Sequence, residues 1–557
     1  KRVGWTRWDL RTFQNLGHHT DMHHHLFATF CRPCRWLGAL GGVALAAAIL
    51  CATPAQAQQR VSLPSLGGSV SLSLGDERRL GQQIMPSLHN SGLVVDDLLL
   101  NQYLTDLWRP VFAAARARGD VPDGMLQQFA WQLWLLSPTA INAFALPGGY
   151  FGFHLGLLAS APDDAALASV LAHELSHVTQ RHIARIIERQ ESQAPWLIGA
   201  MILGAATIAA SPDASAALIV GGQAASIQTQ LNFSRDMEQE ADRQGLVVLA
   251  ESGFDPKGFV RLFDTLQQAN RLNDDGAFPY LRSHPLTTER VADMQGRLFS
   301  VPAEPSRTGD WTAHLPDPDA SALLRVRAAV LAAADEGDVL QAWHALPPAA
   351  AATRPALRWA QDYRRALAAW ATKRPDVAWA RLRQVMADTT NPAVVQVLRE
   401  TALGWLASSA KFEALPAARV EGWLNTALVD GQNGRRAALL AAAAYIAHMG
   451  QAAPAGSLDQ VAAALRAWLV SHSDDALGWQ LMARVSAQQG QSLGALRAEA
   501  ESYVARELWQ GALDRLSAAK RLIAQGKERV SEADVAIIYA REKAVNQAMA
   551  LAQSARR

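Results

Sequence analysis

Hydrophobic positions along the chain change their spacing at about residue 300. Within residues 70–300, apolar runs of strand length alternate with stretches in which apolar residues recur at helical spacing. After about residue 320, helical spacing prevails almost throughout. Residues 301–320 are rich in proline and scattered charges without a regular period, which is typical of a linker. The pattern predicts a mainly α fold with a small β-sheet, followed by a helical domain at residues 321–557.

Two apolar segments predict the sheet. Residues 129–137, FAWQLWLLS, have the aromatic and aliphatic density of a buried strand. Residues 142–158, NAFALPGGYFGFHLGLL, place two short apolar runs on either side of Pro-Gly-Gly, which predicts a strand, a turn and a second strand.

The stretch ASVLAHELSHVTQRHIARII has helical apolar spacing, and the acidic pair before it suits a helix N-terminus. We expect one helix, continuous to about Gln193. It places His173 and His177 one turn apart on one face, with Glu174 about 100° round the axis. This arrangement is typical of zinc proteases, although two partly buried histidines on an ordinary amphipathic helix give the same pattern. His182, five residues after His177, is expected on the opposite face as a surface or core residue.

A third metal ligand is needed, because catalytic zinc takes three protein groups and keeps one position open. Residues 234–245, SRDMEQEADRQG, supply acidic candidates at helical spacing. Of Glu238 and Asp242, four residues apart, one can bind the ion while the other accepts a hydrogen bond from a ligand imidazole. Glu240 is expected on a different face. Alone, the segment would equally suit a solvated acidic helix.

The N-terminal region predicts a secretory signal peptide. Residues 1–57 carry six lysine and arginine side chains against two acidic ones, followed by the sixteen-residue uncharged run WLGALGGVALAAAILC and a small-residue site ending at Ala57. We expect cleavage near Ala57 and export to the periplasm, with a retained anchor or a lipid on Cys51 as alternatives. Because the sequence begins with lysine, residues 1–21 are a candidate upstream mis-read, with the start at Met22.

Cysteine and charge usage narrow the function classes. All three cysteines precede the expected cut, which fits an oxidising compartment. The net charge is only +1, and no basic stripe is interleaved with aromatics, so nothing predicts a nucleic-acid partner. Residues 196–210 are apolar but too short to span a bilayer, and SPDAS separates them from the apolar run AALIVGG. A buried or partly exposed helical pair covering one side of the site is expected there, with a membrane hairpin as the alternative. Peripheral membrane contact by residues 196–225 stays open.

The helical C-terminal part contains a faint repeat. Two sets of five residues share the same spacing: Ala366, Ala369, Ala378, Leu382 and Val385, and then Ala500, Tyr503, Ala512, Leu516 and Ala519. The spacing matches the small and large packing positions of tetratricopeptide helix pairs. A generic helical bundle is the alternative in so alanine-rich a chain.

Four segments in order, NAFALPGGY, LAHELSHVTQRH, SRDMEQEAD and RSHPLTTERVADM, resemble the HtpX-like and CAAX-prenyl-protease-like zinc metallopeptidases. The resemblance covers roughly residues 70–300 and implies a zincin-type metallopeptidase domain at residues 58–300. It implies one zinc ion per chain with three protein ligands, a general base and a supporting acid, annotated in such families as a proton donor. The resemblance implies His173, His177 and Glu238 as the three zinc ligands. It implies Glu174 as the general base and Asp242 as the supporting acid.

Two further candidates flank this set. His284, before a proline in a loop, could stabilise an oxyanion, occupy the open zinc position until substrate displaces it, or be structural. The segment Asn142, Ala143, Phe144 and Ala145 is a candidate edge strand that would hold an extended substrate by strand addition, or it is only core.

The signal peptide and the repeats extend what the resemblance implies. Together with these two features, the resemblance implies a periplasmic endopeptidase that degrades misfolded or stalled outer-membrane proteins, with the repeats docking protein substrates or the outer-membrane assembly machinery. The rival interpretation is a periplasmic chaperone or scaffold for outer-membrane protein assembly in which proteolysis is secondary.

Overall fold

The computed structural model describes residues 72–137, 140–189, 235–272, 279–301, 309–333, 337, 339, 355–408, 417–526 and 531–554. These residues belong to one compact unit. The expected signal peptide at residues 1–57 and the apolar segment at residues 196–225 lie outside the described residues. The domain boundaries expected from the sequence therefore stay a prediction.

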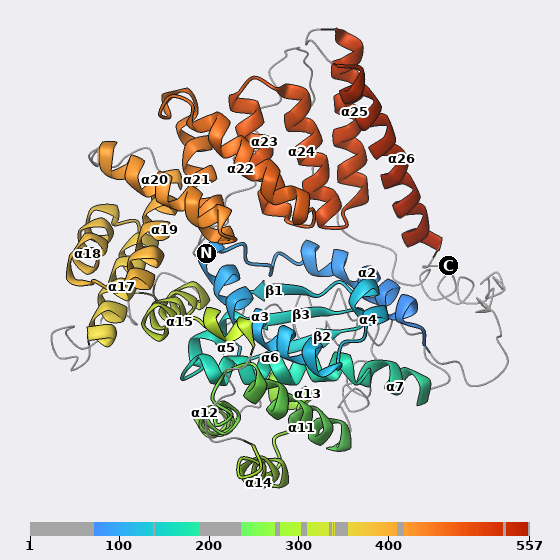
Figure 1. Ribbon diagram of the computed structural model, residues 1–557, viewed down its shortest axis with the longest axis vertical. Coiled ribbons are helices and arrows are strands. Elements are labelled where there is room, and N and C mark those ends of the chain that lie inside the picture. Colours follow the sequence, from blue (N-terminus) through green and yellow to red (C-terminus); the bar gives the residue numbers. More distant parts are fainter. Residues whose placement is uncertain are drawn as a thin grey trace, which may run out of the picture. The chain divides into compact units, whose positions relative to one another are not determined.

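The three described strands form one mixed sheet (Figure 1). They are β1 (Gln132–Leu136), β2 (Ala143–Leu146) and β3 (Tyr150–His154), in the order β1-β3-β2. β1 runs parallel to β3, and β2 pairs with β3 in the antiparallel direction. Gly148 and Gly149 turn the chain between β2 and β3 with φ of 81° and 80°, a backbone region that favours glycine. The strands predicted from the sequence are confirmed, and β2 is an edge strand among the described ones.

The two faces of the sheet contact different helices. One face packs with α2 (Leu74–Asn90) and α7 (His182–Arg189) in a small apolar cluster. The other face joins the main core together with α3 (Leu98–Arg118) and α6 (Asp164–Thr179). The helix that carries both candidate histidines therefore lies directly against the sheet.

The helix α6 begins as predicted but ends early. The Asp163 carboxylate accepts a hydrogen bond from the Ala166 amide and caps the helix. The expectation of one continuous helix to about Gln193 is wrong, because α6 ends at Thr179 and Arg181 adopts a left-handed φ of 54°. A separate helix, α7, starts at His182.

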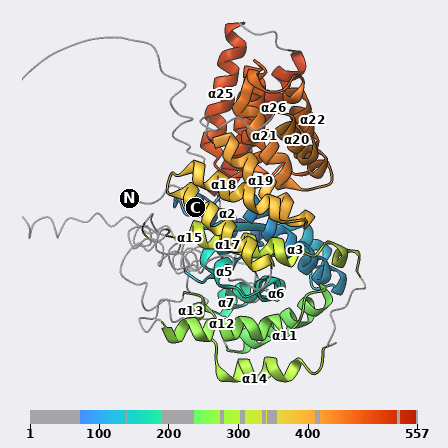
Figure 2. The same ribbon diagram turned by 90° about the vertical axis from the view of Figure 1, so that its left-hand side faces the viewer.

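A second helix, α11 (Arg235–Glu251), packs along α6 on the side away from the sheet (Figures 1 and 2). Gly245 permits this close approach, since a Cβ at this position would lie 3.2 Å from the backbone of Ala172 and His173. The remaining elements of the first part are α4 (Asp123–Gln128), α5 (Leu155–Ser160), α12 (Gly258–Leu272), α13 (Pro279–Ser283), α14 (Thr288–Arg297) and the 3-10 helix η1 (Asp310–His314).

Beyond residue 317 the described elements are helical. They are α15 (Pro318–Ala332), α17 (Pro355–Ala371), α18 (Pro375–Asp388), α19 (Pro392–Ser408), α20 (Ala417–Gln432), α21 (Arg436–Met449), η3 (Gly450–Ala452), α22 (Ser457–Ser471), α23 (Ala476–Gln488), α24 (Ser492–Ala505), α25 (Trp509–Gln525) and α26 (Glu532–Ser554). The predicted fold class, mainly α with a small β-sheet, is confirmed.

The two predicted repeat segments lie on helix hairpins. The pairs α17–α18 and α24–α25 pack tightly, and nine of the ten repeat positions are buried, Tyr503 being half-buried. Each hairpin turns through a non-glycine residue in the left-handed region, Lys373 or Glu507, four residues after the second repeat position. These equivalent turns support a helix-pair repeat, whereas membership of the tetratricopeptide class stays a prediction.

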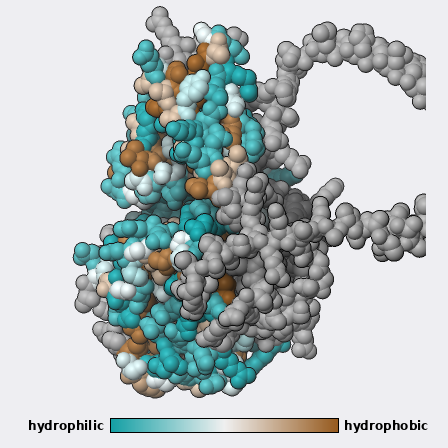
Figure 3. All heavy atoms as spheres, turned by 90° about the vertical axis from the view of Figure 1, so that its right-hand side faces the viewer, coloured by the Kyte–Doolittle hydropathy of each residue, from teal (hydrophilic) through white to brown (hydrophobic). Residues whose placement is uncertain are grey.

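On the face drawn in Figure 3, hydrophilic residues cover most of the described surface, and apolar side chains occur in scattered small groups. None of the helices in the described ranges combines the length and apolar character needed to cross a bilayer.

Candidate metal centre

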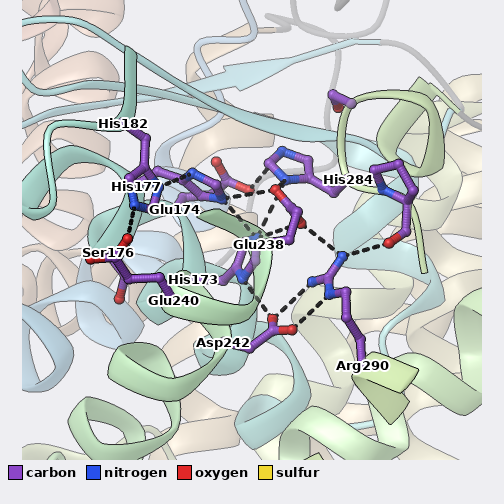
Figure 4. Close-up of polar contacts among 12 residues, drawn as sticks. His173, Glu174, Ser176, His177, His182, Glu238, Glu240, Asp242, His284 and Arg290 are labelled. Atoms are coloured by element: carbon purple, nitrogen blue, oxygen red, sulfur yellow. Dashed lines mark hydrogen bonds and ion pairs between the residues drawn. The ribbon is translucent and has the colours of Figure 1, made fainter. Parts of the chain in front are cut away.

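The helix α6 presents two histidines to a buried centre (Figure 4). His173 and His177 are only 2% and 1% exposed, and their Nε2 atoms lie 3.0 Å apart. Their position four residues apart puts both rings on one face of α6, as the sequence predicted.

The helix α11 brings a carboxylate to the same point. Glu238 Oε1 lies 3.3 Å from His177 Nε2, and Glu238 Oε2 lies 3.5 Å from His173 Nε2. Burial disfavours the charged form of Glu238, but the neighbouring His284 and hydrogen bonds with the three histidines outweigh it and hold the pKa of this carboxyl well below its usual range. Glu238 is therefore a buried anion between two imidazoles.

His284 completes the cluster from the loop between α13 and α14. Its Nδ1 lies 2.9 Å from Glu238 Oε1 and 3.3 Å from His173 Nε2. One ligand atom from each of His173, His177, Glu238 and His284 falls within 4.8 Å of the others. The sequence alone did not determine whether His284 reaches this centre, because it belongs to a separate loop.

The donor set fits a metal ion of zinc's size. Two donors about 2.0–2.1 Å from a tetrahedral zinc ion are separated by about 3.3 Å. The ring nitrogens and carboxylate oxygens of His173, His177 and Glu238 are 3.0–3.5 Å apart, close to that separation. Imidazole and carboxylate are ligands that zinc accepts, so the cluster is compatible with a metal ion.

Glu174, the predicted general base, lies beside this cluster at 1% exposure. Its Oε1 is 3.5 Å from His284 Nε2 and accepts no hydrogen bond, although it is buried. Burial raises the pKa of this carboxyl above its usual value, with smaller opposing effects from His284 and His173. The carboxylate is thus a stronger base than an exposed glutamate.

Asp242 lies behind His173. Its Oδ1 is 3.0 Å from His173 Nδ1, the ring nitrogen that faces away from the cluster. This is the hydrogen bond that the sequence spacing predicted for one of the two acidic residues. A role of Asp242 as proton donor stays a prediction.

Arg290, which the sequence did not single out, holds this carboxylate. It donates from Nε and Nη2 to both oxygens of Asp242 at 2.7 and 2.8 Å, and its Nη1 lies 2.7 Å from Glu238 Oε2. Nη1 also donates to the Pro285 carbonyl at 2.8 Å, which ties the His284 loop to α11. One signal was visible, since Arg290 occupies the first turn of α14, where a positive charge is unfavourable to the helix dipole.

His182 also differs from expectation, whereas Glu240 lies outside the metal cluster as expected. His182 Nδ1 lies 2.8 Å from His177 Nδ1, so its side chain is not on the opposite face. The break at Arg181 is the physical reason, because it ends the helical rotation on which that expectation depended. Glu240 Oε2 lies 3.2 Å from His182 Nε2. Burial lowers the pKa of His182 to about 4, so the ring is neutral near pH 7.

The candidate substrate strand lies close to these histidines. Ala143 and Ala145 of β2 face the core that contains α6, whereas Phe144 faces the opposite side of the sheet. Asn142, just before β2, accepts a hydrogen bond from the His154 amide through its backbone carbonyl at 3.0 Å. Ala145 and Leu146 of β2 line a small cavity together with His177 and Val178 of α6.

Comparisons with known proteins agree with this geometry. Residues 113–298 match peptidase family M48 and include both histidines, Glu238 and His284. The chain is 36% identical over 249 residues to the beta-barrel assembly-enhancing protease of Escherichia coli K12, covering 44% of this chain and 48% of that protein. For the protein of that name from Yersinia pestis, identity is 34% over 247 residues, covering 44% and 49%.

A more distant relative comes from yeast. The chain is 26% identical over 224 residues to the mitochondrial metalloendopeptidase OMA1 of Saccharomyces cerevisiae, covering 39% of this chain and 59% of that protein. The chain spans about half the length of the bacterial relatives that it matches. The part of the chain that contains the buried cluster thus matches peptidase family M48, and a helical region follows it.

Proposed function

We propose that this chain, which carries a peptidase family M48 domain at residues 113–298, is a zinc-dependent endopeptidase of the bacterial envelope. One observation carries the proposal: the buried donor atoms of His173, His177 and Glu238 converge beside a buried Glu174. We expect one zinc ion per chain at this point, and the donor types and separations support this.

The chemistry follows from the positions of the side chains. Zinc, when bound, polarises the scissile carbonyl and lowers the pKa of the attacking water. Glu174 takes the proton from this water and then delivers it to the leaving amine. Its pKa is raised, mainly by burial, which makes Glu174 a stronger base for the first transfer. Asp242 orients the imidazole of His173 through the bond to Nδ1.

His284 acts in this proposal as a fourth ligand that closes the centre until substrate displaces it. The distances of its Nδ1 from Glu238 and His173 support this role. The alternative is that His284 stabilises the oxyanion of the reacting peptide. The short distance between its Nε2 and Glu174 Oε1 supports this alternative.

The substrate would lie extended along β2, because an edge strand offers unpaired backbone groups to a peptide. The names of the bacterial relatives refer to β-barrel assembly. We therefore expect misfolded or stalled outer-membrane β-barrel proteins as substrates. The helical region at residues 321–557 would dock these substrates or the outer-membrane assembly machinery. The expected signal peptide places the protein in the periplasm.

Metal analysis together with peptide cleavage tests the proposal on the wild-type chain and on Glu174→Gln. The variant should keep its zinc while cleavage falls by about 10²–10⁴-fold, since it loses the group that accepts the proton. Glu289→Gln makes the same change at an exposed position of α14 and should cleave like the wild type. Cleavage that persists in a strong chelator would refute a metal-dependent mechanism.

A chaperone or scaffold role is the second candidate, because helix pairs continue to residue 554, far beyond the M48 match. The Glu174→Gln variant separates the two functions in cells that lack the native gene. If outer-membrane protein assembly is restored fully by this variant, the scaffold role is primary. If assembly is restored by the wild type alone, proteolysis is required.

A further inference from the structure

The end of α6 brings a fourth histidine, His182, to the back of the metal centre. In an unbroken helix, His182 would be rotated by about 140° from His177. Instead, Arg181 adopts its left-handed conformation while its Nε bonds to Glu77 Oε1 at 2.7 Å. The helical rotation of α6 is interrupted there, and His182 reaches His177 at 2.8 Å while staying fully buried.

The directions of the hydrogen bonds follow from the first ring. His177 Nε2 faces the cluster, so its lone pair is the one that binds a metal, and the ring proton sits on Nδ1. This proton is donated to His182 Nδ1. The proton of His182 then sits on Nε2 and is donated to the Glu240 carboxylate at 3.2 Å. Every donor in this order meets an acceptor.

The hydrogen bonds form a series from His177 through His182 to Glu240, and Arg185 holds its outer end. Arg185 of α7 contacts Glu240 Oε2 through Nη1 at 2.8 Å. Glu240 comes from α11, the helix that also carries Glu238, so the series joins α6, α7 and α11 around one ligand. His173 has a corresponding support, since Asp242 accepts from its Nδ1 and Arg290 holds Asp242.

We propose that His182 and Glu240 are positioning residues that fix the tautomer and orientation of His177 as a metal ligand. The inference rests on the metal centre of the proposed function. It adds a second support, through an intervening histidine, to the direct one that Asp242 gives His173. Partners behind a ligand imidazole typically change metal affinity by about 10–100-fold when they are removed.

Zinc affinity of the full chain, measured by competition with a chromophoric chelator, tests the proposal. His182→Leu should bind zinc about 10–100-fold more weakly, because His177 loses the acceptor that fixes its proton on Nδ1. His182→Asn should recover most of this loss, since the amide oxygen takes the place of Nδ1 as acceptor. Glu240→Gln should weaken binding less, because a neutral acceptor remains.

His154→Leu is the matched control. His154 is also a fully buried histidine of this domain, but neither of its ring nitrogens has a hydrogen-bond partner. The same substitution there disturbs packing equally and should leave zinc affinity unchanged. Rescue by asparagine at position 182, without an effect at position 154, distinguishes positioning from general loss of packing.

The outcomes separate this inference from the proposed function. If the wild type binds zinc and both His182 variants bind it equally well, the positioning role is overturned and the metalloprotease stands. If the wild type binds no zinc, both fall. Should His182→Leu fail to fold, ring-nitrogen NMR of the zinc-loaded wild type decides. Protons on His177 Nδ1 and His182 Nε2 support the inference, and a His182 protonated on Nδ1 overturns it.

Discussion

Two buried polar networks of this protein differ in what balances their charges. The first lies where α3 meets the helical region. Asp97 caps α3 through the Leu100 amide and accepts bonds of 2.6–2.9 Å from Nε and Nη2 of Arg327 on α15. Arg327 also donates to the Tyr363 hydroxyl at 3.2 Å. In this network, opposite charges and hydrogen bonds between protein groups balance one another.

The second network, the candidate metal centre, is arranged differently. Ring nitrogens of His173, His177 and His284 approach one another and Glu238, while Glu174 Oε1 is buried without a hydrogen bond. Ring nitrogens and carboxylate oxygens, which are metal-ligand atoms, converge here on a single point. A cation would stabilise this arrangement. The comparison teaches that burial of charge alone does not mark a functional site. Convergence of several potential metal-ligand atoms on one point does.

The largest expected effect among these tests is that of Asp97→Asn on the free energy of unfolding. Because Arg327 would stay buried without a counter-charge, the free energy of unfolding should fall by about 3–5 kcal/mol. Zinc stoichiometry should stay unchanged, since no group of the metal centre is altered. Chemical denaturation and metal analysis measure the two quantities.

The neighbouring Asp96→Asn is the control for this change. Asp96 pairs with Arg506 at 3.7 Å and its side chain is 48% exposed, so its loss should change stability by less than about 1 kcal/mol. Equal effects of the two substitutions, or loss of zinc from Asp97→Asn, would contradict the view that the Asp97 network is purely structural.

His154 provides a second and smaller test, because it is a buried titratable group outside both networks. Burial lowers the pKa of His154 to about 3, whereas an unfolded histidine titrates near 6.5. Between these values the unfolded state binds the additional proton. The contribution of His154 to the free energy of unfolding is therefore fully present above pH 6.5. Below this pH, the free energy of unfolding falls by up to about 1.4 kcal/mol per pH unit.

The measurement compares denaturation of the wild type and His154→Leu at pH 7 and pH 5. Between these pH values the wild type should lose about 2 kcal/mol more than the variant, and the pH dependence of all other groups cancels in the difference. Parallel loss in the two proteins would mean that His154 is protonated in the folded state.

Local patterns in the sequence predicted much of this structure. Apolar density identified β1, Pro-Gly-Gly identified the turn between β2 and β3, and Asp163 identified the start of α6. The spacing of His173 and His177 placed both rings on one face. Each of these features depends on residues close together in the chain, which is why sequence reasoning reached them.

Features that depend on distant partners were not predictable. Nothing around Arg181 interrupts the helical period, and its left-handed conformation is held by Glu77, more than a hundred residues earlier. His182 was misplaced for the same reason. Arg290 likewise shows its role only when α14 is packed against α11 and its charge meets Asp242 and Glu238.

His284→Ala has the smallest expected effect and tests how the metal centre differs from the Asp97 network. If His284 is a displaceable fourth ligand, its removal should raise kcat/KM for a peptide several-fold, a change of about 1 kcal/mol, because substrate no longer competes with it. Zinc should stay bound at one per chain through the other three ligands.

His448→Ala, at an exposed position of α21, is the control and should have the activity of the wild type. A fall in kcat of about 10²–10³-fold would instead identify His284 as the oxyanion donor. In either case the substitution should alter catalysis far more than stability, since a bound cation would balance the partners of His284. Among the described residues, by contrast, no second carboxylate is paired with Arg327.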